Sequence, residues 1–554
     1  MFLLFSGLEK DRKMEIGAAT VYESVPVSSA MAMAVMESSG IRALMDSLVE
    51  YDDQRRLSPG MAVKAMIGPI FDSRKKMPLS GIRAFYKGAP VDMLFGDIEE
   101  CSLNDHALAR NLDDLYDTGL DDLFWKCSSM IKRRYGFDSK IRHMDSTNYT
   151  VYAAACEREG EAVPAFGGNA KNGRNDLLQY NAATVTDGDR IMEYSKAYSG
   201  NTADPVMDRD TIAFLKANID PEENTLIADC KLVNTELVSE LAGMGMGFIS
   251  KAPSSFSDKI RDDIVYSVLS GYMDASSVDG YSVYDTESDT VCGKLRFVAY
   301  RSPKGTAREM EYLEVQGRKD AEKLFGQFFK KRFACETDAM MTFDETLSKH
   351  RNSAYVIEGT PVRMEERMRR ATRGRPPKDS DGPVTRVSWK IDVSMRFDRE
   401  LAERIAQAYD VSVIVTNLPF ATEDAGNVRH GATTDTVLRL YLDQYKVEHT
   451  YRLLKSGMGV DSVYVHTPSR ANALLFVVSI ATLISSIMDA LMGRNGDRRT
   501  VKQICHGLQN ATAIYDRARD RLTVGGPEGS MDDLLSYLSV FDTDPSLLLG
   551  IYDR

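Results

Sequence analysis

Four polar residues near the C-terminal end of the chain recur at spacings that suit one face of a helix. They are Tyr441, Gln444, Glu448 and Lys455. At about 100° per residue these positions fall within one arc of roughly 60°. Apolar residues of the same segment fall in a neighbouring arc, which predicts that the polar stripe lies beside the core. A carboxylate in such a stripe can be held rigidly, although a solvated helix face would show the same pattern.

Two aspartates lie in segments that predict strands. Asp145 interrupts the alternating segment RHMDSTNY, although aspartate is a poor strand former. Asp229 ends the short apolar run TLIAD, directly before a segment that predicts a helix. Each residue also has an ordinary structural explanation, as an edge or turn aspartate at 145 and as a helix N-cap at 229.

Asp145, Asp229 and Glu448 together suggest a site built from carboxylates. Three carboxylates that converge on one point repel one another unless cations neutralise them. Oxygen ligands of this kind suit Mg²⁺ or Mn²⁺, which keep open positions for water and phosphate. Two such ions, about 3.5–4 Å apart, can carry out phosphoryl transfer without a nucleophilic side chain.

Several ordered segments extend this pattern to a known family. The segments are MDSTNY, GGNAKNGRNDLLQ, YSGNTAD, LIAD, a Y-x2-Q-x3-E-x6-K spacing and VYVHTPSR. In this order they resemble the DDE transposases of the insertion sequence 4 superfamily, closest to the branch with a large insertion before the catalytic glutamate. The resemblance runs from about residue 138 to 490. It implies cut-and-paste transposition on an RNase H-like core.

The resemblance also implies roles for individual residues. Asp145, Asp229 and Glu448 would be catalytic and bind the metal ions, which we expect to be two Mg²⁺ or Mn²⁺ ions. Tyr441 and Lys455 would contact phosphates of the transposon end. The partners would be double-stranded DNA, both terminal inverted repeats and target, bound by a homodimer on paired ends.

The chain departs from the family pattern at one position. Gln444 stands where the pattern has arginine, so it brings neither a charge nor a bidentate fork to the phosphate clamp. Lys446 and Arg452 are close enough in sequence to substitute. Arg452 extends the polar stripe and is a candidate DNA contact, as is Gln444.

Other basic residues are candidate DNA contacts. Lys171 and Arg174, in the glycine-rich segment, would put two cations where a DNA backbone could pass, although a hairpin with solvated charges remains an alternative. Residues 363–378 hold seven basic and two acidic residues. This segment could lie in a minor groove as an extended arm, and a solvated linker is the alternative.

Changes of pattern along the chain predict an α/β protein whose RNase H-like catalytic core is interrupted by a mixed α+β insertion domain. The expected segments are a helical N-terminal domain that binds DNA ends (1–135), the first half of the core (136–245), the insertion (246–400), the second half with the glutamate helix (401–499) and a helical tail (500–554).

Composition limits the class of protein. The net charge of −12 means that a DNA surface must be a local basic patch. The seven cysteines are scattered and never spaced as CxxC, which is typical of reduced thiols in a cytosolic protein. The apolar segment 471–491 predicts a buried core helix, since its uninterrupted apolar run is too short to cross a bilayer. We therefore expect a cytoplasmic, nucleoid-associated protein without a membrane partner.

Two other functions remain open on the sequence. One is a domesticated, non-catalytic DNA-binding protein that keeps the transposase fold, for which the Gln444 departure is the argument. The other is a metal-dependent DNA nuclease without strand transfer, which would use the same three carboxylates.

Overall fold

The structure, a computed structural model of the 554-residue chain, describes residues 22–72, 78–151, 162–166, 176–229, 234–252, 258–350, 353–367, 385–444, 467–526 and 530–548. The chain forms two compact units. The first comprises Met1–Leu232, Gly243–Gly247 and Leu442–Arg554, and the second comprises Val233–Ala242 and Phe248–Tyr441.

After one short strand (residues 22–26), the first unit continues with helices, as the sequence predicts for most of this stretch. They are α1 (Val27–Ser38), α2 (Ile41–Leu48), α3 (Pro59–Phe71), α4 (Ile82–Phe85), α5 (Val91–Phe95), α6 (Asp105–Thr118) and α7 (Leu120–Tyr135). The LSPG segment begins α3, because the Ser58 side chain accepts a hydrogen bond from the Met61 amide and Pro59 occupies the first turn. Asn104 caps α6 in the same way through the Ala107 amide.

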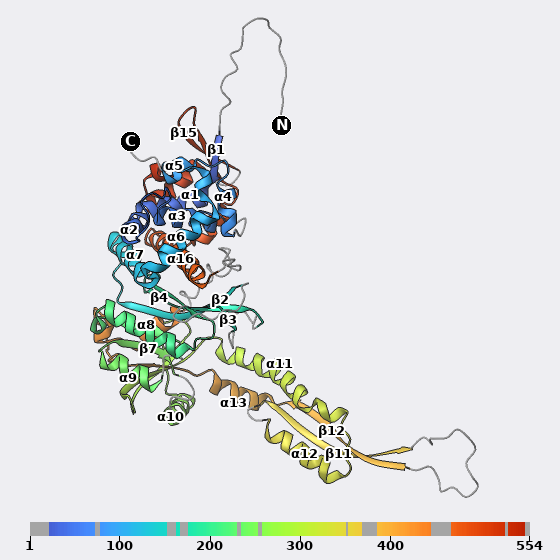
Figure 1. Cartoon of the computed structure of the whole chain (residues 1–554). Helices are drawn as coiled ribbons and strands as arrows, with labels where there is room; N and C mark the ends of the chain where they lie inside the picture. The colour runs from blue at the N-terminus through green and yellow to red at the C-terminus, as the bar shows by residue number, and fades with distance from the viewer. Residues whose placement is uncertain are drawn as a thin grey trace, which may run out of the picture. The chain divides into compact units, whose positions relative to one another are not determined.

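The apolar segment near the C-terminus forms α16 (Pro468–Arg494), the central helix of this unit. It contacts α1, α3, α6, α7 and a strand of the sheet, and it lies among the N-terminal helices in Figure 1. Among the described residues it is the one helix long and apolar enough to span a membrane by length and composition, and 83% of its most apolar window is buried. The expected core helix is therefore confirmed.

The sheet of the first unit carries the segments that predict strands. Its strands are β2 (Ile141–Val151), β3 (Ala165–Phe166), β4 (Leu178–Asp187), β5 (Met192–Ser199) and β6 (Thr225–Ala228). Their order is β3-β4-β2-β6, and β5 also pairs with β4. β2, β4 and β5 form the expected antiparallel meander. Helix α8 (Asp204–Asn218) then leads to β6, which is parallel to β2.

The C-terminal tail is not entirely helical. Besides α17 (Val501–Gly507) and α18 (Met531–Val540) it contains the hairpin of β14 (Thr512–Asp516) and β15 (Arg521–Gly525). β14 pairs with β1 (Tyr22–Pro26) from the opposite end of the chain. The helical prediction for the tail is therefore wrong for residues 512–525, which form a local hairpin that also pairs with the distant β1.

The second unit has its own set of antiparallel strands. They are β7 (Gly247–Lys251), β8 (Asp274–Ala275), β9 (Ser282–Thr290), β10 (Gly293–Arg301) and β13 (Ser412–Thr416), in the order β7-β13-β10-β9-β8. Helices α9 (Thr235–Gly243), α10 (Asp258–Leu269) and α14 (Thr434–Leu442) complete this part. The stretch expected as an insertion thus contributes several strands to a sheet.

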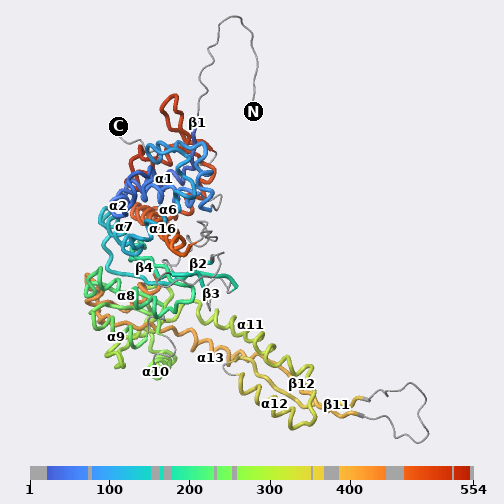
Figure 2. Tube along the Cα trace, viewed as in Figure 1, coloured from blue at the N-terminus to red at the C-terminus, as the bar shows by residue number. Residues whose placement is uncertain are grey.

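A long hairpin and three helices form the rest of the second unit. The hairpin joins β11 (Tyr355–Arg367) to β12 (Thr385–Phe397), and α11 (Gly305–Phe325), α12 (Glu336–Ser348) and α13 (Arg399–Tyr409) accompany it. Its core is aromatic, with Phe325, Phe328 and Phe343 in mutual ring contact. Figure 2 follows the chain through this hairpin. Residues 363–367 belong to β11 and not to a loop, whereas 368–384 lie outside the described residues.

Candidate functional site: two aspartates on adjacent parallel strands

Asp145 lies in the middle of β2 and its side chain is partly exposed. The strand around it is rich in threonine, tyrosine and isoleucine, which favours an extended backbone. Asp145 pairs with Thr184 of β4, whose hydroxyl donates a hydrogen bond of 3.0 Å to the Asp145 carbonyl oxygen. The Ser146 amide donates to the Asp145 carboxylate at 2.8 Å. The aspartate is therefore held by strand pairing and by its own neighbour.

Asp229 follows directly after β6 and is exposed. The parallel register of β2 and β6 pairs Ile141 with Thr225 and His143 with Ile227. Two residues further along each chain come Asp145 and Asp229, so the register brings them to the same level. Residues paired in this way project to the same face of a sheet, with backbones about 5 Å apart.

Two carboxylates brought to the same level of a sheet would repel each other in water and attract a hard divalent cation. Asp145 and Asp229 would therefore suit Mg²⁺ or Mn²⁺ as two of the ion's protein ligands. Within the part of the chain that the structure describes, no group of three or more histidine, cysteine, aspartate or glutamate residues could hold a metal ion. A third carboxylate would have to come from elsewhere, and the predicted one, Glu448, lies outside the described residues.

Three of the segments that carry the family resemblance meet beside this site. Asn148, three residues after Asp145, donates a hydrogen bond of 2.6 Å to the side-chain oxygen of Asn181 in β4. Asn181 in turn donates to the carbonyl oxygens of Gly200 and Thr202, in the turn after β5, at 3.2 and 3.0 Å. The two asparagines thus tie MDSTNY, LLQYN and YSGNT together.

Gly200 shows why the turn needs glycine. A Cβ atom at this position would overlap the carbonyl oxygens of Gln179 and Ala165. Gln179 belongs to β4 and Ala165 to β3, so two strands approach the turn at once. Any side chain at 200 would push the turn away from Asn181.

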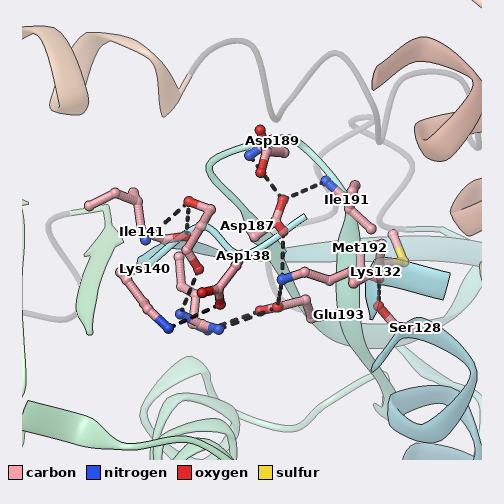
Figure 3. A network of polar contacts seen from close by, with 12 residues as sticks. Ser128, Lys132, Asp138, Lys140, Ile141, Asp187, Asp189, Ile191, Met192 and Glu193 are labelled. Carbon is pink, nitrogen blue, oxygen red and sulfur yellow. Dashed lines mark hydrogen bonds and ion pairs between the residues drawn. The ribbon is translucent and has the colours of Figure 1, made fainter. Parts of the chain in front are cut away.

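A buried network of ion pairs between side chains joins the same sheet to helix α7, and Figure 3 shows it. Lys132 of α7 forms ion pairs with Asp187, at the end of β4, and with Glu193 of β5. Arg142 of β2 pairs with Glu193 at 2.9 Å. Arg142 is three residues from Asp145, so the two side chains leave the strand on opposite faces. The network fixes β2 without occupying the face of the aspartates.

Burial and the neighbouring charges shift the pKa values of the side chains in this network. It raises the pKa of Asp187 to about 6, although the neighbouring Lys132 ammonium opposes this effect. Burial by itself lowers the pKa of Lys132, but the attraction of Glu193 and Asp187 outweighs it, so that pKa is raised above its ordinary value. Lys132 therefore stays charged, which is what two neighbouring carboxylates need.

In the second unit, a buried arginine holds the start of α14. Arg296 of β10 is 2% exposed and makes a bidentate pair with Asp285 of β9, at 2.6 and 3.1 Å. It also donates to the Ala432 carbonyl oxygen at 2.8 Å, and Asp285 accepts a hydrogen bond of 2.6 Å from the Thr434 hydroxyl. The first turn of α14 is thereby joined to the sheet.

α14 carries the first residue of the predicted polar stripe. The ring of Tyr441 lies 6.2 Å from that of Tyr300 in β10 and is partly exposed. The helix ends at Leu442, Asp443 is in a turn, and the backbone is helical again at Gln444. The helix predicted through 441–455 is therefore interrupted at Asp443, and the residues after Gln444 lie outside the described part of the chain.

The remaining predicted contacts fall outside the described residues. These are Glu448, Arg452 and Lys455 after α14, and Lys171 and Arg174 in the glycine-rich segment. Sequence reasoning missed the roles of Asn181 and Arg296. Asn181 lies two residues after the motif GGNAKNGRNDLLQ, so its polarity in a buried strand was a usable signal. Nothing local pointed to Arg296, whose partners are far away in sequence.

Comparison with known proteins adds two findings. A family model described as a domain of unknown function (DUF4277) matches residues 29–129, which lie within the N-terminal helices. No curated protein matches the chain. Among solved structures, the chain is similar to one described as "piggyBac transposase synaptic complex with hairpin DNA", with 7% identity over 88% of this chain and 82% of that one, and a TM-score of 0.39. A similarity this slight carries no argument about fold or function.

Proposed function

We propose that this protein is a metal-dependent DNA transposase, which cuts at the ends of a mobile element and joins them to target DNA. The observation that carries the proposal is the register of β2 and β6, which pairs His143 with Ile227, because continuing it by two residues would bring Asp145 and Asp229 to the same level. The ordered sequence motifs are the further support for the proposal, and they give Glu448 as the third carboxylate. The proposed fold is an RNase H-like core with an insertion before Glu448.

The chemistry divides between the ions and the chain. When bound, two Mg²⁺ or Mn²⁺ ions would activate the attacking oxygen and stabilise the leaving one. Asp145 would bind an ion from within the paired strand β2, and Asp229 from the residue directly after β6. Ligands positioned by paired strands would keep the phosphate and the attacking oxygen aligned. Strand transfer would use the same residues with a DNA 3′-hydroxyl in place of water.

The proposed partners follow from this activity. The chain would bind its terminal inverted repeats and target DNA as a homodimer on paired ends, in the cytoplasm of its host cell. Tyr441, Gln444, Arg452, Lys455, Lys171 and Arg174 are the proposed DNA contacts.

The test is cleavage of DNA that carries the sequences flanking the gene. We expect full-length protein to cut it with Mg²⁺ or Mn²⁺ and not in EDTA. We expect Asp145→Asn and Asp229→Asn to lower the rate by roughly a hundredfold or more, because each removes the charge of a metal ligand. The matched control is Asp138→Asn, at a site 85% exposed just before β2, which should cut normally.

The products separate the proposal from its alternatives. Joined products identify a transposase, whereas cleavage without joining identifies a nuclease. Binding without metal-dependent cleavage identifies a non-catalytic DNA-binding protein. Cleavage that persists in EDTA contradicts the metal mechanism.

A further inference from the structure

A cavity of about 320 Å³ opens on the sheet of the first unit, and neither the motifs nor the two aspartates account for it. It lies between the α6–α7 corner, strands β2, β4 and β5, and α16. Tyr149, Leu475 and Phe476 contribute apolar surface to its lining and are each buried. A cavity of this size and character fits one small ring system and not an extended cofactor.

One residue that lines the cavity has an unsatisfied, buried polar atom. Asn472 of α16 lines it and is only 4% exposed. Its side-chain nitrogen donates to the Ala162 carbonyl oxygen at 3.1 Å, whereas its Oδ1 atom has no hydrogen-bond partner. A buried acceptor without a donor costs free energy, which a ligand N–H at this place would recover.

The mouth of the cavity is polar and charged. Lys196 lines it with a side chain that is 38% exposed, and its ammonium lies 3.8 Å from the Asp121 carboxylate. Ser195 and Ser479 share a hydrogen bond of 2.8 Å at the wall. The same ammonium lies 3.7 Å from the Asp210 carboxylate, so its charge is already neutralised. A sugar with its hydroxyls would find hydrogen-bond partners here.

The cavity lies on the same sheet face as Asp145. Tyr149 is four residues further along β2, which places it on the same face about 13 Å away. A nucleic-acid strand that reaches Asp145 would therefore pass within a few nucleotides of the cavity.

We propose that this cavity binds a nucleobase that carries an amino group, with its ring against Tyr149 and Phe476 and its amino N–H donated to Asn472. The ring could belong to a free nucleoside or to an unpaired base of DNA, since both present the same chemistry. This inference goes beyond the proposed cleavage, because binding here needs neither metal ions nor Glu448.

The first experiment titrates full-length protein in EDTA with adenosine and with purine riboside, which lacks the amino group, and follows the heat of binding. We expect adenosine to bind at least about tenfold more tightly, because only its amino group satisfies Asn472. The same pair is then compared as single-stranded oligomers of equal length, one with adenine bases and one with unsubstituted purine bases, so that backbone contacts cancel. A preference in the oligomers alone identifies a base of DNA, and a preference for free adenosine identifies a nucleoside.

Two variants and one matched control make the test specific. Asn472→Leu should abolish the preference for the amino group. Ala197→Phe, at a partly exposed position that lines the cavity, should block binding of either ring. Asn111→Leu is the control, because Asn111 is also buried in a helix, with a bonded nitrogen and an unpartnered oxygen, but does not line the cavity.

The outcomes are distinct from those of the cleavage test. Equal affinity for the two rings, or a preference that survives Asn472→Leu and Ala197→Phe, overturns the nucleobase site. Equal loss of the preference in Asn111→Leu overturns it as well, because the effect would then come from general loss of structure. Failure to cut DNA leaves the binding result unaffected.

Discussion

In the proposed site, Asp145 and Asp229 would repel each other unless a cation neutralised them. Asp145 lies within β2 and Asp229 directly follows β6, and these strands pair in register as far as His143 and Ile227. Metal that binds the proposed pair in the folded protein would therefore add stability that the metal-free pair lacks. Each aspartate should therefore lower the stability of the folded protein without metal and raise it when metal is bound.

We predict this reversal in thermal unfolding. In EDTA, Asp145→Asn should melt at the same temperature as the natural protein or slightly higher, because one of two repelling charges is gone. With millimolar Mn²⁺ the natural protein should gain stability, by about 1–3 kcal/mol at concentrations well above the dissociation constant, and the variant should gain much less. Asp138→Asn should follow the natural protein in both conditions. An equal gain for Asp145→Asn would remove this residue from the proposed metal ligands.

Another acid, Asp489, is partly buried near the C-terminal end of α16. Asp489 accepts a hydrogen bond of 2.6 Å from the Val501 amide at the start of α17, and burial raises its pKa to about 6. Its ordinary pKa is 3.8. The folded protein therefore holds the proton more tightly than the unfolded chain does, so the contribution of Asp489 to stability falls as the pH rises from about 4 to 6, and stays low above that range.

We predict that Asp489→Asn stabilises the protein above pH 6. Asparagine keeps the oxygen that accepts from Val501 but carries no charge to bury. The gain should be about 1–3 kcal/mol at pH 7.5 and should disappear near pH 4, where the natural side chain is protonated too. Denaturant unfolding of both proteins at the two pH values measures it. A gain that does not depend on pH would mean that the charge of Asp489 is not the cause.

At the scale of elements, two ion pairs with similar geometry are expected to contribute differently to the free energy of unfolding, because one is buried and the other exposed. Arg296 and Asp285 are 2% and 18% exposed, whereas Lys294 and Glu287, on the same two strands, are 64% and 42% exposed. Loss of one partner leaves the other charge unpaired in the first case and merely solvated in the second. The inner pair also fixes the start of α14, so it positions the helix that leads toward Gln444.

We predict a clear difference between the two pairs. Arg296→Met should lower the free energy of unfolding by about 3–5 kcal/mol, because it leaves Asp285 without its charged partner. Lys294→Met should change it by less than about 1 kcal/mol. Chemical denaturation of the second unit, followed through Trp389, measures both. Similar decreases in the free energy of unfolding in the two variants would show that burial does not determine how much these ion pairs stabilise the protein.

Sequence patterns predicted the positions of helices and strands better than they predicted which strands pair with each other. The strands around Asp145 and Asp229, the hairpin strands and the buried α16 all follow from local alternation or apolar runs. The pairing of β1 with β14 did not follow, since each strand acquires its partner only when the two ends of the chain meet. The turn at Asp443 was missed for a related reason, because spacing alone does not distinguish one helix from two.

The candidate site shows the same division. The sequence indicated Asp145 and Asp229 as candidate site residues, from an acid in a strand and an acid at the end of an apolar run. It did not predict that they share one register, because register depends on pairing between strands about 80 residues apart. The unsatisfied Asn472 in its cavity could not be predicted at all, since in sequence it is one polar residue in an apolar helix.

At the scale of the whole molecule, charge decides how DNA can be bound. The chain carries a net charge of −12, so its average field repels DNA. Binding must then depend on local clusters of basic residues, and residues 363–378 form the densest one that the sequence shows. Arg363 and Glu365 at its start pair with each other at 3.1 Å in β11, so they neutralise one another. The excess positive charge lies further on, in residues 367–378.

We predict that this excess governs the salt dependence of DNA binding. Each phosphate contact contributes about 0.9 to the slope of log affinity against log salt on duplex DNA. Replacement of Arg369, Arg370, Arg373 and Arg375 by alanine should therefore reduce the slope by several units and weaken binding most at low salt. The control is alanine at Arg363 and Glu365 together, which removes a neutral pair and should leave the slope unchanged. Gel-shift titrations from low to moderate salt give both slopes. An unchanged slope in the fourfold variant would make this segment a solvated connection within the hairpin, and the DNA contacts would have to be found elsewhere on the chain.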